Sequence, residues 1–281
     1  MASEANHAEF IVDARWLAEH RANPSLVLVD TRPASEYWAG HLRGARHFDP
    51  FPFHYHDTSE KGLAEFRSQL EWIFSALGIT GDRTVVFYEN DAGICAARGA
   101  WALEHLGHRA ACILDGGLKA LTGQELVAAA DQIMPSDFRA RPRPETVASY
   151  EYVLNRLGRR DVQILDVRAD DEYYGERVRA RHGGAIPGAI HLEWINALDA
   201  RGAFKSAAEL KAAFDKLGLR PDAEVITYCQ GGYRSAHSYF ALRMAGYRNV
   251  RSYMGSWAEW GNRDDLPIEQ PRRPQPGGKE R

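Results

Sequence analysis

The stretch LGLRPDAEVITYCQGGYRS (residues 217–235) joins a short apolar run to a glycine-containing loop and then to a helical pattern. Its first twelve residues align with LGITGDRTVVFY (residues 77–88) without a gap. A short apolar run bounded by turn signals predicts a buried strand. Because the same block occurs twice at a domain-length spacing, the sequence indicates an internal duplication.

Three further blocks recur in the same order in both halves: LVLVDTR (26–32) with QILDVR (163–168), GHLRGA (40–45) with GAIPGA (184–189), and DGGLKAL (115–121) with MGSWAEW (254–260). In each half, apolar runs alternate with segments of helical periodicity, a pattern typical of α/β units with a parallel sheet. We expect strands at 26–29, 85–88 and 112–114, and again at 164–167, 225–228 and 250–253. A capping-box pattern at 206–209 and a glycine at position 218 predict the start and end of one helix.

The length of 281 residues suits two domains better than one. We predict an N-terminal domain over 1–124, a linker over 125–147, a C-terminal domain over 148–266 and a flexible tail over 267–281. The linker contains MPSDFRARPRP (134–144), which is rich in Pro and Arg and has no periodic apolar pattern. Each domain is expected to be a mostly parallel sheet flanked by helices.

Composition narrows the range of functions. The net charge of −3 gives no general attraction for nucleic acid or for an acidic membrane surface. The N-terminus has no pattern of a signal peptide, and no stretch approaches the length of a membrane span. The three cysteines lack metal-site spacing. We therefore expect a cytoplasmic protein that needs no metal or other cofactor, binds neither nucleic acid nor membrane, and is a monomer.

Cys229 follows the predicted strand 225–228 directly and precedes a loop that leads into a helix. Ligands of open α/β sheets bind at the carboxyl ends of the strands, and a helix N-terminus offers free N–H groups to anions. Gly231 and Gly232 allow the backbone to curl so that several N–H groups converge. These groups and Arg234 should favour a thiolate at Cys229.

The other two cysteines, Cys95 and Cys112, have neither a glycine loop nor a downstream arginine beside them. Free cysteine is among the most frequently buried residue types. We expect both to be buried side chains of the first domain, in a helix and in a strand respectively.

Together with the Cys229 loop, the blocks LDVR, GAIPGAIHL and GSWAEWGN make the chain resemble the rhodanese family, and in particular its tandem two-domain sulfurtransferases that use thiosulfate or 3-mercaptopyruvate. The resemblance covers most of residues 10–266. Tandem members of this kind usually keep one catalytic domain. The position that matches Cys229 in the first half is Glu89. Since a carboxylate cannot form a persulfide, the resemblance implies an N-terminal domain that carries no sulfur and that supports the active site.

The resemblance also implies a reaction. The Cys229 thiolate would take the outer sulfur of thiosulfate, hold it as a persulfide and pass it to cyanide or to a thiol acceptor. The cradle would consist of the loop residues Gln230, Gly231, Gly232, Tyr233, Arg234 and Ser235. Asp166 and Arg168, where an earlier strand ends, would support neighbouring loops.

Two alternatives stay open. Cysteine phosphatases of this fold carry Cys-x5-Arg, whereas only four residues separate Cys229 from Arg234, which suits a sulfur atom better than a phosphoryl group. A 3-mercaptopyruvate sulfurtransferase would have a small Gly-Ser/Thr-Gly-Val loop, which is absent. Thiosulfate and mercaptopyruvate enzymes both have an arginine where this chain has Glu172. We expect thiosulfate as the donor. The arginines of ERVRAR (176–181) either attract that anion or form a solvated loop.

Overall fold

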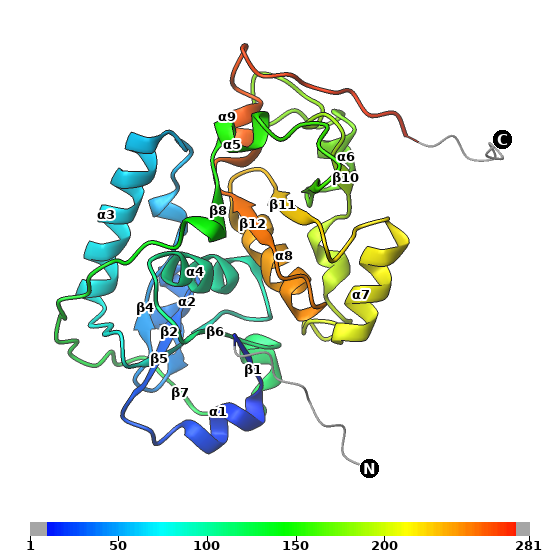
Figure 1. Ribbon diagram of the computed structural model, residues 1–281. Coiled ribbons are helices and arrows are strands. Elements are labelled where there is room, and N and C mark those ends of the chain that lie inside the picture. The colour runs from blue at the N-terminus through cyan, green and yellow to red at the C-terminus, as the bar shows by residue number, and fades with distance from the viewer. Residues whose placement is uncertain (1–9, 274–281) are drawn as a thin grey trace.

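The structure, a computed structural model, describes residues 10–273 and contains two five-stranded sheets (Figure 1). The first has the order β1-β6-β5-β2-β4 and the second β10-β9-β11-β12-β8, with all neighbours parallel. The strands of the first sheet are β1 (Ile11–Val12), β2 (Leu26–Asp30), β4 (Arg46–His47), β5 (Thr84–Tyr88) and β6 (Ala111–Leu114). Those of the second are β8 (Val147–Ala148), β9 (Val162–Asp166), β10 (Ile190–His191), β11 (Glu224–Tyr228) and β12 (Val250–Tyr253).

Helices cover these sheets: α1 (Ala14–His20), α2 (Ala34–Ala39), α3 (Glu60–Ala76), α4 (Ile94–His105), α5 (Tyr150–Leu154), α6 (Asp170–Tyr173), α7 (Ala207–Lys216), α8 (Tyr233–Met244) and α9 (Ser256–Trp260). Short 3-10 turns lie at Phe51–Phe53, Gly117–Ala120, Pro144–Thr146 and Trp194–Ala197. Within the described range, no helix is both long and apolar enough to cross a bilayer.

The predicted fold class and the six predicted strands are confirmed, with bounds that differ by a residue or two. The helix predicted after position 206 is α7. Its Ser206 side chain accepts the N–H of Glu209, whose carboxylate returns to the Ser206 N–H, so both free donors are satisfied. Gly218 follows the helix at φ +77°, a conformation that favours glycine.

The segment predicted as a linker has little regular secondary structure. It contains β7 (Leu126–Val127), which pairs antiparallel with β3 (His41–Leu42), and it ends in β8 at the edge of the second sheet. Phe138 within it is buried against the first domain. In the predicted tail, Glu269 exchanges two backbone hydrogen bonds of 2.9 Å with Ala185. Positions 1–9 and 274–281 lie outside the described residues, and the domain limits stay a prediction.

The two domains meet along α4 and α8, which lie side by side in the centre of Figure 1. One apolar core continues across this contact, from Ala97 and Ala100 on α4 to Tyr239 and Phe240 on α8. At the end of the contact, the buried Glu104 carboxylate lies 2.8 Å from the Arg243 guanidinium. The domains therefore form a single packed unit. The carboxyl end of β11 lies at the contact between them.

Candidate active site

Cys229 is the first residue after β11 and lies at the carboxyl end of the second sheet. The loop Gln230–Gly232 leads from it into α8. Gly232 has φ +90°, and a Cβ there would lie 2.7 Å from the carbonyl oxygen of Met254. This position therefore requires glycine, which explains how so few residues can turn the chain around a sulfur atom.

The Cys229 side chain is buried, with 1% of its surface exposed. The Gly232 N–H donates to its Sγ at 3.2 Å. Burial alone would raise the pKa of this thiol, but the Arg234 guanidinium and the N–H groups of Ser235, Gly231 and Gly232 together lower it below its usual value. The sulfur thus accepts at least one backbone N–H of the predicted loop, and the lowered pKa fits a site that favours the thiolate.

The thiol pKa values of the other two cysteines shift in the opposite direction to that of Cys229. Cys95 on α4 and Cys112 on β6 are buried, as predicted. Burial raises the pKa of both thiols, that of Cys112 to about 12. Only Cys229, of the three, has surroundings that favour the anion.

The remaining side chains of the loop point away from the sulfur and fix its surroundings. Gln230 donates through Nε2 to the Arg179 carbonyl at 3.1 Å. Tyr233 donates its hydroxyl to the Pro50 carbonyl of the first domain at 2.7 Å. The Ser235 hydroxyl lies 2.9 Å from that of Ser252, in the core. The backbone of this loop faces the sulfur, while its side chains anchor it to three other segments.

Arg234 is bound to Glu172 rather than free in solvent. Its guanidinium donates to both carboxylate oxygens, at 2.5 and 3.1 Å. Arg177 and Arg179 also lie 3.2 Å from this carboxylate, which is 1% exposed. Burial opposes the charge on Glu172, but Arg234 and the other donors lower its pKa to about 2. Glu172, which stands where the family pattern has an arginine, therefore forms ion pairs with three arginines beside the Cys229 loop.

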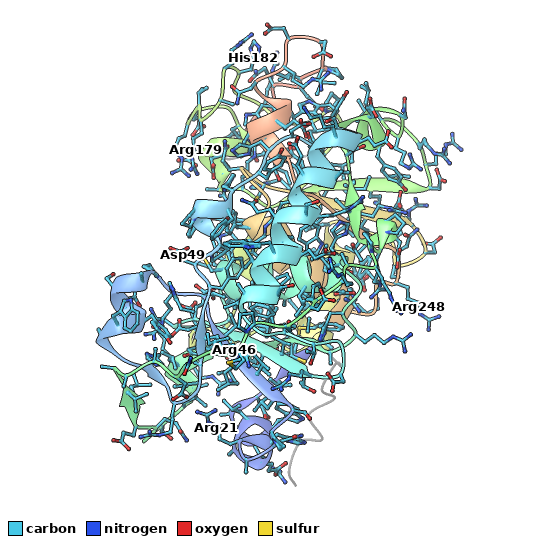
Figure 2. The ribbon with its side chains drawn as sticks, turned by 90° about the vertical axis from the view of Figure 1, so that its left-hand side faces the viewer. Arg21, Arg46, Asp49, Arg179, His182 and Arg248 are labelled. Carbon is cyan, nitrogen blue, oxygen red and sulfur yellow. The ribbon has the colours of Figure 1, made fainter. Side chains whose placement is uncertain are left out.

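The segment ERVRAR is partly tied down and partly exposed. Arg177 and Arg179 remain half exposed while they contact Glu172. Figure 2 shows Arg179 near the left edge and His182 near the top of the molecule, both above Asp49. An anion that approaches this segment meets guanidinium groups held in place by a buried carboxylate.

Asp166 and Arg168 form a buried pair. Arg168 donates to both oxygens of Asp166, at 2.6 to 3.0 Å, and to the Gly184 carbonyl at 2.7 Å. Asp30, Arg32 and the Gly40 carbonyl repeat this arrangement in the first domain. Since the copy without a cysteine has the same pair, its geometry fits the supporting role predicted for it: it joins the end of a strand to the following loop.

Sequence reasoning missed several residues that touch the loop. Ser256, at the start of α9, accepts the Cys229 N–H at 3.1 Å through its Oγ. From the first domain, the ring of His54 packs against Gly231, and the Arg98 guanidinium lies 3.4 Å from the Gly232 carbonyl. His54 and Arg98 reach Cys229 only because the two domains are docked, so no local motif marks them. Ser256 lies within the repeated block MGSWAEW (254–260), but that block does not reveal its contact with Cys229.

In the first domain, Glu89 takes the place of the cysteine. One of its carboxylate oxygens accepts the N–H groups of Cys95 and Ala96, at 2.7 and 2.9 Å. The carboxylate occupies an anion cradle of its own. Burial raises its pKa to about 7, against those hydrogen bonds. Nowhere in residues 10–273 do three His, Cys, Asp or Glu side chains gather in a way that could hold a metal ion.

A duplicated parallel α/β fold with one cysteine in an anion cradle defines a class of proteins that use a cysteine nucleophile. The model of the rhodanese-like domain matches this chain twice, over residues 13–124 and 149–263. The chain belongs to the rhodanese family. It is 35% identical over 261 residues to a thiosulfate sulfurtransferase of Azotobacter vinelandii, which covers 92% of this chain and 96% of that protein. The corresponding protein of Pseudomonas aeruginosa is 36% identical over 264 residues, with the same coverage.

Among solved structures, SseA of Escherichia coli, described as a 3-mercaptopyruvate sulfotransferase, superposes with a TM-score of 0.77 and 28% identity. The match covers 88% of this chain and 98% of SseA. The tandem arrangement of the two domains is therefore shared with a relative whose named donor differs from that of the bacterial thiosulfate enzymes.

Proposed function

We propose that this protein is a thiosulfate sulfurtransferase that carries sulfane sulfur as a persulfide on Cys229. The observation that carries the proposal is the Cys229 sulfur itself, which is buried and accepts the Gly232 N–H, with its pKa lowered by Arg234 and by the N–H groups of the loop. Such an environment stabilises a thiolate, and equally the anionic terminal sulfur of a persulfide.

In the first half of the reaction, the Cys229 thiolate attacks the outer sulfur of thiosulfate. The S–S bond of the donor breaks, sulfite leaves with the bonding electron pair, and Cys229-S-S⁻ remains. In the second half, cyanide or a thiolate attacks the terminal sulfur, and Cys229 leaves again as a thiolate. The N–H groups of Gly231, Gly232 and Ser235 supply preorganised stabilisation in both halves.

Two features support thiosulfate as the donor. Relatives with that name are 35 and 36% identical over nearly the whole chain. In addition, Arg177 and Arg179 present half-exposed guanidinium groups beside the loop, which suits a compact dianion. 3-Mercaptopyruvate is the second candidate, because SseA shares the same tandem fold.

Steady-state assays with cyanide as the acceptor test the proposal. We expect turnover with thiosulfate that exceeds turnover with 3-mercaptopyruvate, and loss of both in Cys229→Ser. Cys112→Ser is the matched control, since that thiol is buried in β6 with a raised pKa, and it should keep full activity. Hydrolysis of an aryl phosphate, with no response to either sulfur donor, would instead identify a cysteine phosphatase.

We also propose that the protein acts as a monomer in the cytoplasm, on a small-molecule donor and a thiophilic acceptor, without nucleic acid or membrane. The near-neutral balance of charges in the sequence supports only the part of this proposal that concerns nucleic acid and acidic membrane surfaces. Light scattering coupled to size-exclusion chromatography should give the mass of one chain, and a mass of two chains would contradict it.

A further inference from the structure

Arg98 lies on α4, in the domain that has no cysteine of its own, yet its guanidinium reaches the Cys229 loop. Its side chain is 4% exposed and lies between aromatic rings, with its Cζ 4.8 Å from the centre of Trp101 and 5.4 Å from that of Tyr233. One terminal nitrogen is 3.4 Å from the Gly232 carbonyl oxygen. A Cβ at Gly232 would lie 2.9 Å from the same nitrogen, so the Arg98 guanidinium also packs closely against the Cα of Gly232.

In contrast to the other buried arginines near the strand ends, Arg98 makes no ion pair with a carboxylate in the part of the chain that the structure describes. The buried Arg32 and Arg168, and Arg234, whose side chain is 13% exposed, each lie 2.5 to 2.6 Å from an acidic oxygen. Burial of a charge without a partner costs free energy and is rare in folded proteins. The aromatic rings and the Gly232 carbonyl offset part of this cost, and an anion beside Arg98 would offset more of it.

The groups around Arg98 identify that charge. His54 and His56 face the same region, and burial together with Arg98 lowers the pKa of both, that of His54 to about 4, so they are neutral at physiological pH. Burial raises the pKa of the Tyr233 phenol, which stays protonated. Cys95 and Asp49 raise the pKa of Tyr233 further. Of the two groups that raise the pKa of Arg98, Tyr233 stays protonated, which leaves Cys229 as the one that can be an anion at neutral pH.

We propose that Arg98 is a positioning residue for the reaction, through which the first domain stabilises the anionic sulfur of Cys229 and holds the Gly232 peptide in place. It complements Arg234, which approaches the same sulfur from α8 within the second domain. The first domain thus contributes to the chemistry although it has no cysteine at the position of Glu89. Stabilisation of a Cys229 persulfide by Arg98 rests on the proposed function, whereas stabilisation of the Cys229 thiolate does not.

Alkylation of Cys229 by iodoacetamide as a function of pH, followed by peptide mass spectrometry, tests the thiolate directly. Arg98→Met keeps an unbranched apolar stem but removes the charge. We expect the midpoint of its pH profile to move upward by about one unit, so that alkylation below the midpoint slows about tenfold. Arg98→Lys should recover most of the shift. The control Arg67→Met removes a half-buried arginine of α3 that contacts His105 instead, and should leave the profile unchanged.

Thermal stability separates this role from a purely structural one. Because a buried cation without a carboxylate is removed, Arg98→Met should melt at the same temperature as the wild type or higher, while its sulfur transfer falls about tenfold. An unchanged pH profile in a folded Arg98→Met protein would overturn the inference. Should that variant fail to fold, the profile of Arg98→Gln decides in the same way: an upward shift supports the inference and no shift overturns it. Failure of the wild type to form a persulfide would refute the proposed function and leave the alkylation result standing.

Discussion

Two residues in equivalent positions, Cys229 and Glu89, show how the same backbone turn receives two different anions. Each follows the strand that pairs with the Asp-Arg strand of its own domain. Each accepts N–H groups from the loop and helix that come after it. The thiol has a lowered pKa in its cradle, whereas burial raises that of the carboxylate to about 7. The second domain is thus arranged for a nucleophile, and the first retains only the shape of the site.

The raised pKa of Glu89 predicts a dependence of stability on pH. In the unfolded chain this carboxyl titrates near 4.5, and in the folded chain near 7. Between those values the folded state binds more protons than the unfolded state, so the contribution of Glu89 to stability falls as the pH rises through this window. We expect Glu89→Gln to gain stability relative to the wild type between pH 5 and pH 8, as measured by urea unfolding at both values. A constant difference between the two proteins would contradict the assignment.

At this scale, sequence reasoning found Cys229 and the loop Gln230–Ser235 because they form one continuous motif. It also found that Glu89 replaces the cysteine. It did not find Arg98 or His54, because they are remote from the motif in sequence and ordinary in type. Ser256 lies in the block GSWAEWGN (255–262), but its contact with the Cys229 N–H could not be predicted from that block. The binding of Arg234 to Glu172 could not be predicted either, since it depends on where α6 places that carboxylate.

At the scale of elements, the turn from β12 into α9 holds the Cys229 loop from the opposite side. The N–H groups of Trp257 and Ala258 donate to the carbonyls of Cys229 and Gln230, at 2.9 and 2.8 Å. Ser256 has φ +53°, and within residues 10–273 no other residue except glycine has a positive φ. Strain of this kind persists where the surrounding structure imposes it, often at functional sites. The gain here is a hydroxyl that accepts the Cys229 N–H.

Substitutions of Ser256 separate the strain from the hydroxyl. Ser256→Ala loses the hydroxyl and keeps the strained backbone, whereas Ser256→Gly loses the hydroxyl and relieves the strain. We expect Ser256→Gly to be more stable than Ser256→Ala by about 1 kcal/mol in urea unfolding. Both should transfer sulfur more slowly than the wild type, to a similar extent. Full activity in either variant would show that the hydroxyl contributes nothing to the site.

The central strands of both sheets were predictable because each is a buried apolar run that ends at a turn signal. The edge strands β1, β4, β8 and β10 were not, since each has two residues and carries no periodic pattern. The pairing of β7 with β3 was missed for the same reason, within a segment that reads as a linker from its composition.

At the scale of the whole molecule, the contact between the domains is part of the active site. Glu104 on α4 accepts from Arg243 at 2.8 Å and from the Tyr239 hydroxyl at 3.2 Å, both on α8. Arg143 adds a third donor from the segment that joins the domains, at 3.0 Å. This buried carboxylate keeps α4 on α8, and thereby keeps Arg98 beside the Cys229 loop.

Removal of this carboxylate should loosen the contact. We expect Glu104→Ala to destabilise the protein by about 2 kcal/mol, because hydrogen bonds to a charged group are lost and their donors remain partly buried. Sulfur transfer should fall in the same variant while its second domain still folds, as judged by circular dichroism. Arg159→Ala, which breaks an exposed ion pair with Asp161, is the control and should cost little. Equal stability of both variants would contradict the role of Glu104.

The sequence reveals the duplication, and hence the existence of two similar domains, but not their mutual placement. That placement depends on the apolar surfaces of α4 and α8, whose residues are buried nearly all round and show no distinct exposed face. The contributions of the first domain to the site follow from this docking.

The most direct test of the whole account is the intact mass of the protein after exposure to thiosulfate and removal of the excess. The wild type should gain the mass of one sulfur atom, peptide mapping should place it on Cys229, and cyanide should remove it. Cys229→Ser should gain nothing. An unchanged mass of the wild type, or a sulfur atom found on Cys95 or Cys112, would contradict the account.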